Sequence, residues 1–391
     1  MNSLDGVKPC IEESLKMRLL GHSDMNGHGA TMQVVGLGNH IYVAHFKPPI
    51  GVSVVNVSDP RHPQVVKQIP AMPGNRCLKL QVANDLLVVS NEQFGDTPVR
   101  TGIAIYELTK PEDPKQVGFF ETKGRGPHWM WFADGRYVYA GAHIDGFTHR
   151  IVLIVDLKEP SNPKEIGRWW IPGMWTAGGE KPWWDPTLNY NIHGLYAVGD
   201  RLYLAMMDAC LGILDISDKT APYMVSQLQW FNGRTAHTVL PLPKRDLLIV
   251  TEETLAFDCM EYPEYIRVID IRDEQNPRIL SRFPLPPGDF RRRGLRCGCH
   301  DVHVNYPGSM IDDRLIYTTN YNAGLRVVDI SDPITPREVA YYVPQAPPTQ
   351  RAIQTNQVYV DARGIIYLTD IEGAGLHILE WKNDTISKQK N

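Results

Sequence analysis

Short runs of β-branched and other apolar residues, each closed by a polar turn, follow one another along the whole chain. One phrase of this pattern returns seven times, as an apolar run that ends in a turn of Asp, Ser and Pro. The copies are GVSVVNVSDPRHP from Gly51, GIAIYELTKPEDP from Gly102, IVLIVDLKEPSNP from Ile151, LGILDISDKTAP from Leu211, IRVIDIRDEQNP from Ile266, GLRVVDISDPITP from Gly324 and the truncated GLHILEW from Gly375. Their closing prolines lie 49 to 59 residues apart, a period that is typical of a repeat architecture.

Each copy lies among further strand-like runs. Two runs precede it, as HWMWF and RYVYAGA do around the turn ADG, and a short apolar stretch such as REVAYYV follows it. Long helical periodicity is absent, which argues against an α/β fold. Four antiparallel strands per unit at this period are typical of a β-propeller blade. The sequence therefore predicts an all-β protein, a seven-bladed β-propeller with four antiparallel strands per blade.

The seventh copy lacks an outer strand, because the pattern stops after GLHILEW. An apolar stretch near the N-terminus, SLKMRLLGHS, precedes the first complete unit and is available to supply that strand. We expect residues 16–24 to close the ring in the last blade, which leaves no unpaired edge between the first and last blades. Residues 1–391 then form a single propeller domain.

At the level of these repeats the chain resembles the LVIVD-repeat β-propeller proteins. The words that carry the resemblance are LIVDL, GILDIS, RVIDI and RVVDISDP, and the repeats cover nearly all of the chain. Members of that family look like bacterial proteins, mostly without an assigned activity. The resemblance therefore implies the architecture and little chemistry.

Four consecutive units, the third to the sixth, carry a histidine where the first strand of the unit begins. These are His128 in RGPHWMWFADG, His193 in NIHGLY, His237 in TAHTVLPLP and His300 in CGCHDVHVN. The first strand of a blade lines the central channel, so we expect the four rings at one mouth of that channel. In the sixth unit His303 is the alternative, because residues three apart on a strand point to opposite faces. The register of the other units favours His300.

A polar side chain follows three of these histidines by fifteen residues, at the end of the second strand. Because that strand runs antiparallel to the first, the position returns to the same mouth. The side chains found there are His143, Asp208 and Glu252, with Glu253 beside the last. We expect them to stand behind the imidazoles as hydrogen-bond partners and to provide the general acid or base of a reaction.

Neutral imidazoles that converge on one point suit a divalent transition metal such as Fe, Zn or Mn. A site of histidines without a thiolate leaves coordination positions open for water, dioxygen or substrate, which is a catalytic arrangement. The arrangement is similar, by analogy of geometry alone, to that of carotenoid cleavage dioxygenases, propellers that hold iron with four histidines on the axis. The alternative is that each histidine caps a strand or fills the channel.

Two long connections lead toward the same mouth. Residues 169–192 hold five of the nine tryptophans, and we expect Trp175, Trp183 and Trp184 to form a lid with flat walls for an aromatic ligand. The alternative is a subunit interface in a homo-oligomer. Arg293 and Arg296 precede His300 and are candidates to bind a carboxylate or phenolate, unless they belong to a solvated basic run.

The bulk composition excludes several classes of function. A formal net charge of -4 gives no electrostatic reason to expect nucleic acid or an anionic membrane surface. No apolar run approaches the length of about 18 residues that a membrane-spanning helix needs, and the opening stretch does not read as a secretory signal. The six cysteines are sparse and predict reduced thiols in a cytoplasmic protein.

Together these features predict a metal-dependent enzyme that acts on a small aromatic or carboxylated molecule at one mouth of a propeller channel. Hydrolase, lyase, isomerase and oxygenase chemistry all remain open. The alternative is a non-catalytic propeller whose rim serves as a scaffold for protein–protein interaction.

Overall fold

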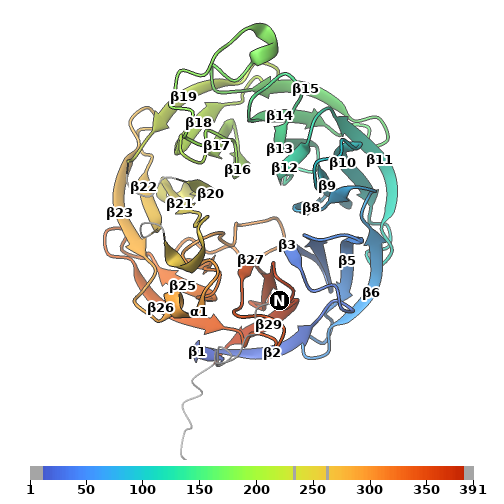
Figure 1. Cartoon of the computed structure of the whole chain (residues 1–391), viewed down its shortest axis with the longest axis vertical. Coiled ribbons are helices and arrows are strands. Elements are labelled where there is room, and N and C mark those ends of the chain that lie inside the picture. Colours follow the sequence, from blue (N-terminus) through green and yellow to red (C-terminus); the bar gives the residue numbers. More distant parts are fainter. Residues whose placement is uncertain (1–11, 232–234, 261–263, 383–391) are drawn as a thin grey trace, which may run out of the picture.

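The computed structural model describes residues 12–231, 235–260 and 264–382 of the 391-residue chain. Its strands form seven sheets arranged as a ring around a central axis, with the chain running once around the ring from blue to red (Figure 1). Residues 1–11 and 383–391 of the predicted domain lie outside the described part. The predicted all-β, seven-bladed β-propeller is confirmed.

The first three blades follow one another in the chain. From the axis outward, the first blade consists of β3 (Thr31–Leu37), β4 (His40–His45), β5 (Ile50–Asn56) and β6 (Gln64–Pro70). The second consists of β7 (Asn75–Arg76) and β8 (Leu80–Ala83), which both pair with β9 (Leu86–Gln93), then β10 (Thr101–Glu107) and β11 (Lys115–Thr122). The third consists of β12 (Gly126–Trp131), β13 (Tyr137–His143), β14 (Arg150–Asp156) and β15 (Lys164–Trp169).

The fourth and fifth blades repeat this order, and short helices lie in their connections. The fourth blade consists of β16 (Leu195–Val198), β17 (Arg201–Ala205), β18 (Leu211–Asp215) and β19 (Tyr223–Leu228), and η1 (Thr176–Gly178) lies in the connection before it. The fifth consists of β20 (Ala236–Leu242), β21 (Leu247–Glu252), β22 (Tyr265–Asp270) and β23 (Arg278–Pro284), with η2 (Pro243–Arg245) and η3 (Phe257–Cys259) between its strands. α1 (Phe290–Arg293) follows it.

The N-terminal segment completes the last two blades. The sixth consists of β24 (Leu315–Thr319), β25 (Leu325–Asp329), β26 (Arg337–Val343) and, outermost, β1 (Glu13–Leu15); the seventh consists of β27 (Thr355–Val360), β28 (Ile366–Asp370), β29 (Leu376–Trp381) and, outermost, β2 (Met17–Ser23). The pairing of β2 with β29 confirms the predicted closing strand, and Figure 1 shows the blue β2 beside the red β29. The addition of β1 to the sixth blade was not predicted.

The sixth blade also lacks a regular innermost strand. The segment that carries His300 contacts β24 through isolated bridges such as Val302 to Thr318, and the backbone N–H of His300 donates to the Thr319 carbonyl at 2.9 Å. This segment therefore occupies the place of a first strand without its full ladder.

The repeated Asp at the end of the third strand of a blade has a local structural role. The carboxylates of Asp156, Asp215 and Asp329 each accept a hydrogen bond from the backbone N–H two residues further on, at 2.8 to 2.9 Å. Such a bond stabilises the turn that leads to the outer strand. These aspartates of the repeat motif thus stabilise turns.

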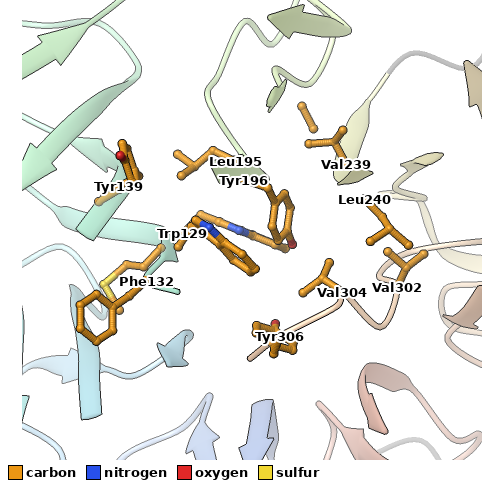
Figure 2. Close-up of a cluster of buried hydrophobic side chains, with 14 of the residues drawn as sticks. Trp129, Phe132, Tyr139, Leu195, Tyr196, Val239, Leu240, Val302, Val304 and Tyr306 are labelled. Atoms are coloured by element: carbon orange, nitrogen blue, oxygen red, sulfur yellow. The ribbon is translucent and has the colours of Figure 1, made fainter. Parts of the chain in front are cut away.

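Apolar side chains from neighbouring blades fill the middle of the channel. Figure 2 shows a cluster with Trp129 of the third blade, Tyr196 of the fourth, and Val304 and Tyr306 of the sixth, and all four are nearly or fully buried. Trp129 also packs against His193 and His237. Its indole therefore lies between this apolar cluster and the end of the channel that holds the histidines. No helix in the described ranges is long and apolar enough to cross a membrane.

Candidate metal centre

A cavity of about 310 Å³ lies at one end of the channel, and all four predicted histidines line it. His128 lies on β12, His193 lies two residues before β16, His237 lies on β20, and His300 lies in the irregular inner segment of the sixth blade. Their rings form a row in which neighbouring centroids are 4.9, 4.2 and 4.0 Å apart. The structure thus brings the four side chains together as the sequence predicts.

Two of the rings are aimed at the axis by β-bulges. The register of the β12–β13 pair shifts between Pro127 and Trp129, and that of the β20–β21 pair shifts between Ala236 and Thr238. His128 and His237 are the extra residues at these shifts. A bulge re-aims a side chain relative to its ladder and is common beside functional sites.

One pair of Nε2 atoms lies at a distance that suits shared ligation, and two sets of three ligand atoms lie close together farther along the row. His128 Nε2 is 3.2 Å from His193 Nε2. Two nitrogens bound to one metal at about 2.1 Å would be roughly 3.0–3.4 Å apart. Farther along the row, His237 Nε2 and His300 Nε2 lie 4.0 and 3.7 Å from the carboxylate of Glu253. His193, His237 and Glu253 each offer a ligand atom within 4.8 Å of the other two.

Every Nδ1 atom of the four rings has a hydrogen-bond acceptor on its other side. His128 Nδ1 lies 2.8 Å from Glu92 Oε1, and His193 Nδ1 lies 3.2 Å from the His237 carbonyl. His300 Nδ1 lies 2.8 Å from the Asn356 carbonyl, on β27. A carbonyl can only accept, so these rings carry their proton on Nδ1. Their Nε2 lone pairs are then directed into the cavity.

For His237, a pair of hydrogen bonds through the Thr238 hydroxyl places the ring proton on Nδ1. His237 Nδ1 lies 2.7 Å from Thr238 Oγ1, and that hydroxyl donates to Asp301 Oδ1 at 3.0 Å. Since the hydroxyl proton is committed to Asp301, the oxygen accepts from the ring. Asp301 itself is 2 % exposed and also accepts from Val302 N and from Gln357. Carboxylates and carbonyls behind imidazoles are the usual outer partners of histidine metal ligands.

The Nε2 atoms of His128 and His193 face each other closely enough to share a proton or another cation. Burial would raise the pKa of Glu92, but His128 and Arg76 outweigh it and hold that pKa at about 2, so Glu92 is an ionised acceptor. With both Nδ1 atoms protonated, two neutral rings would direct lone pairs at each other across 3.2 Å. Burial lowers the pKa of His128 to about 4, with a further contribution from Arg150, so a proton is a poor candidate for that cation at neutral pH.

The remaining rings are equally hard to protonate. Burial lowers the pKa of His193, His237 and His300 well below 6.5, and positive charge nearby acts in the same direction. For His300 the charge comes first from Arg296. Neutral imidazole is the form that ligates metal.

Glu253 is the carboxylate that enters the cavity. Its Oε1 accepts from the Tyr321 hydroxyl at 2.9 Å and from Arg296 at 3.1 Å, while Oε2 faces His237. Burial raises the pKa of Glu253, partly offset by Arg296 and Tyr321. This group is held in place and favours a proton more than a free glutamate does.

The other predicted acid–base residues lie outside the cavity lining. Glu252 turns to the opposite side, where it binds Arg267, Trp230 and the Tyr265 backbone N–H. Asp208 accepts from the Asn189 backbone N–H at 2.7 Å, and His143 pairs with Gly126 at the end of β13. None of the three contacts an axial ring, so the prediction that they hydrogen-bond to the histidines fifteen residues before them is wrong. The observed partners of the Nδ1 atoms are Glu92, Thr238 with Asp301 behind it, and two backbone carbonyls.

None of the three predicted tryptophans lines the cavity, although Asn189 of the same segment does. In Figure 1 the connection between β15 and β16, which carries η1, extends outward past the rim of the ring. Trp184 is buried and stacks on Tyr190, while Trp183 is 67 % exposed and Trp175 is 41 % exposed. Because these indoles pack within their own segment and none lines the cavity, their positions give no support to an aromatic lid.

The two predicted arginines have different places. Arg296 lines the cavity and packs over Tyr321. Arg293 is buried away from it, in ion pairs with Glu13 and Asp289, which is a structural role at the join between α1 and β1. His303 also points away from the cavity, since its Nε2 lies 2.9 Å from the Met310 carbonyl and its Nδ1 accepts from the Val360 N–H.

Sequence reasoning missed several polar residues of the cavity and its surroundings. They are Arg76, Lys79, Glu92, Arg150, Thr238 and Asp301. Two of them had a visible signal, because Asp301 directly follows His300 and Thr238 directly follows His237. Arg76, Lys79 and Glu92 come from the second blade, which a search confined to the histidine units does not reach, whereas Arg150 begins the third strand of the blade that holds His128.

A disulfide joins two loops beside the cavity. Cys259 and Cys297 are bonded, with their Cα atoms 5.5 Å apart, which corrects the prediction that all the cysteines are reduced thiols. Cys77, Cys210 and Cys299 are buried free thiols, and Cys10 lies outside the described residues. The two bonded residues are 38 positions apart, and only the folded ring brings their loops together. The cysteines therefore no longer support a cytoplasmic location.

Comparison with known proteins gives a repeat family and a fold. The model of the LVIVD repeat matches residues 28–69, 193–229 and 316–343. No curated protein matches the sequence. Among solved structures, the chain is similar to the WD40 β-propeller domain of Doa1, with a TM-score of 0.57 and 11% identity over 97% of this chain and 99% of that one.

Two further propellers have comparable similarity. The computationally designed Ika8 protein has a TM-score of 0.52 and 10% identity over 92% of this chain and 97% of that one. Saccharomyces cerevisiae Sqt1 has a TM-score of 0.52 and 8% identity over 88% of this chain and 81% of that one. At such identities the similarity shows the fold alone. The chain is thus a seven-bladed β-propeller that carries LVIVD repeats.

Proposed function

We propose that the four axial histidines hold one divalent transition metal (Fe, Zn or Mn) and that the protein is a metal-dependent enzyme acting on a small carboxylated molecule. The observation that carries the proposal is the acceptor behind each of the four Nδ1 atoms, which leaves the Nε2 lone pairs of four residues that line one cavity free to ligate. Any one histidine with such a partner would be unremarkable. Four on consecutive blades, facing one cavity, favour a metal over strand capping.

The cavity supplies the other parts that a reaction needs. Four imidazoles would fill a tetrahedral Zn²⁺ site, whereas a five- or six-coordinate Fe²⁺ or Mn²⁺ would keep positions open for an oxygen ligand and would polarise it. Glu253 is the group best placed to hold or take up a proton, at Oε2, because Oε1 is already occupied by Tyr321 and Arg296. Its raised pKa brings it closer to neutral pH, where proton transfer in both directions is efficient.

The charge of the cavity favours an anionic substrate. Arg76, Lys79, Arg150 and Arg296 all line it, and they surround a volume of about 310 Å³ that admits a small molecule only. Phe46 and the indole of Trp129 provide apolar surface, so an aromatic acid fits as well as an aliphatic one. Of the two predicted features of the substrate, an aromatic ring and a carboxylate, we therefore keep only the carboxylate in the proposal.

A screen for turnover tests the proposal. The protein, stripped with a chelator and reloaded separately with Fe²⁺, Zn²⁺ or Mn²⁺, is incubated with a panel of small aliphatic and aromatic acids, with and without oxygen. We expect turnover with one metal and one class of acid, and none in the stripped protein.

The Glu253→Gln variant separates catalysis from metal binding. It should keep its metal and lose roughly 10²–10⁴-fold in rate, the usual contribution of a general acid or base. Glu121→Gln, at an exposed ion pair with Arg100, is the matched control and should match the wild type. Absence of turnover with every metal would favour the non-catalytic scaffold.

A further inference from the structure

Arg150 is a buried cation that faces the cavity without a partner. It begins β14, its residue surface is 7 % exposed, and it lines the cavity with His128 and His193. Its backbone N–H donates to Asn191 Oδ1 at 2.9 Å, but its guanidinium makes no hydrogen bond or ion pair with any residue in the described ranges. The Nε atom is fully buried and unsatisfied.

The other three cations of the cavity each have a carboxylate. Arg76 pairs with Glu92 at 2.7 Å, Arg296 with Glu253 at 3.1 Å, and Lys79 with Asp301 at 3.4 Å. Lys79 also lies 3.4 Å from the centre of the Trp129 ring. In the part of the chain that the structure describes, Arg150 is the cavity cation whose charge no carboxylate balances at contact distance.

An unpaired buried guanidinium is costly to the fold. Taking a charge out of water without a partner is strongly unfavourable, and arginine cannot relieve the cost by losing its proton at ordinary pH. Burial lowers the pKa of Arg150 to about 10, still far above neutrality. A charge kept at such a cost points to a ligand that neutralises it.

We infer that Arg150 binds the carboxylate of the substrate in the cavity beside His128 and His193. This inference rests on the proposed function, to which it adds the residue that recognises the substrate. The planar guanidinium offers parallel N–H donors that match the two oxygens of a carboxylate. One unbalanced positive charge suits a monoanion, and the lack of any protein carboxylate at Arg150 leaves its donors to the ligand.

The place of Arg150 also orders the ligand relative to the metal ligands. Arg150 pairs with His143 in the β13–β14 ladder, and its carbonyl accepts from the Ile192 N–H, one residue before His193, so Arg150 lies at the His128–His193 end of the row. Glu253 and Arg296 lie at the His300 end. A substrate with its carboxylate at Arg150 therefore has the rest of its body between the histidines and Glu253.

The test measures binding of benzoate and of its neutral isostere benzamide by calorimetry. The wild type should prefer benzoate by about 10- to 100-fold, the range that a charge-assisted hydrogen-bonded pair supplies. In Arg150→Gln this preference should disappear. Arg136→Gln, at an exposed ion pair with Asp156 at the other end of the same blade, is the matched control and should keep it. Tighter binding of inorganic phosphate than of benzoate by the wild type would overturn the carboxylate assignment.

A second measurement excludes a structural role. Because Arg150→Gln removes an unpaired buried charge, its melting temperature without ligand should equal or exceed that of the wild type. A lower melting temperature together with an unchanged preference for benzoate would make Arg150 a structural residue and overturn the inference.

Metal content, measured in the same preparations, separates this inference from the proposed function. Preparations without metal that still prefer benzoate through Arg150 would retain the anion site and reject the metal enzyme. Preparations with metal in which Arg150→Gln binds benzoate as the wild type does would reject the anion site alone.

Discussion

Thr238 is the residue at which the metal hypothesis can be tested with the smallest change. Its hydroxyl accepts from His237 Nδ1 at 2.7 Å and donates to Asp301 Oδ1 at 3.0 Å, and the residue is completely buried. Thr238→Val replaces the hydroxyl by a methyl group of similar size. The ring then loses the acceptor that fixes its proton on Nδ1, and Asp301 loses one donor.

The expected magnitude follows from these two hydrogen bonds. A neutral bond contributes about 0.5–1.5 kcal/mol and one to a charged group about 1.5–3 kcal/mol, so the free energy of unfolding should fall by roughly 2–4 kcal/mol. Loss of an outer partner typically lowers metal affinity by about 10- to 100-fold, which is about 1.4–2.7 kcal/mol. Both effects should appear in the same variant.

The assay is a competition titration of metal against a chelator, combined with urea unfolding. Thr101→Val is the matched control, because the Thr101 hydroxyl is also buried and donates to the Thr122 and Gly124 carbonyls without touching an axial histidine. The control should lose stability and keep its metal affinity. If Thr238→Val binds metal as tightly as the control does, the hydrogen bonds through Thr238 have no part in ligation and the reasoning fails.

Three further predictions concern the ring, the buried histidines and the tryptophans. Deletion of residues 1–23 removes β2 and exposes the edge of β29, so the loss should be large beside a net stability of roughly 5–15 kcal/mol; an unchanged melting temperature in calorimetry would contradict it. As pH falls from 6.5 to about 4, the metal-free protein should lose stability in urea, because burial lowers the pKa of His45, His128 and His303 to about 4 and the unfolded chain binds more protons in that window. A flat stability profile there would refute the assignment of neutral buried rings. Trp184→Ala should cost about 3–5 kcal/mol and the exposed Trp183→Ala less than about 1 kcal/mol, with metal content unchanged in both; loss of metal in either would restore a role at the site.

The fold was predictable because its signals are local. Each blade repeats the same β-branched run and the same Asp turn, and Asp156 or Asp215 forms its turn bond within two residues of itself. The row of histidines was predictable for the same reason, since each stands at the same position of its unit.

Most partners of the histidines were not predictable in this way, because they come from a neighbouring blade. Glu92 lies on β9, one blade before His128, and the carbonyl that faces His300 belongs to Asn356 on β27, one blade after it. A backbone carbonyl leaves no trace in the sequence. The prediction counted fifteen residues within one blade, from the first strand to the second. The bulges at His128 and His237 shift the register between those two strands, so the count does not give the partner.

The lack of an ion-pair partner for the Arg150 guanidinium among the described residues could not be predicted from the sequence either, because it depends on the folded chain. In the sequence it is one arginine at the start of an apolar run. In the folded chain Glu92, Glu253 and Asp301 form ion pairs with other cations, and Arg150 forms none with any residue that the structure describes.

The central claim is that His128, His193, His237 and His300 ligate one metal ion through Nε2. Its most direct test is X-ray absorption spectroscopy at the metal edge, with metal per chain measured by mass spectrometry, on wild type and on the four single His→Ala variants. The account predicts one metal per wild-type chain, nitrogen neighbours at about 2.0–2.1 Å with imidazole scattering, and a loss of metal in every variant that leaves the fold intact. Wild-type protein that stays free of stoichiometric metal after loading with Fe²⁺, Zn²⁺ and Mn²⁺, or that keeps its metal in all four variants, would contradict it.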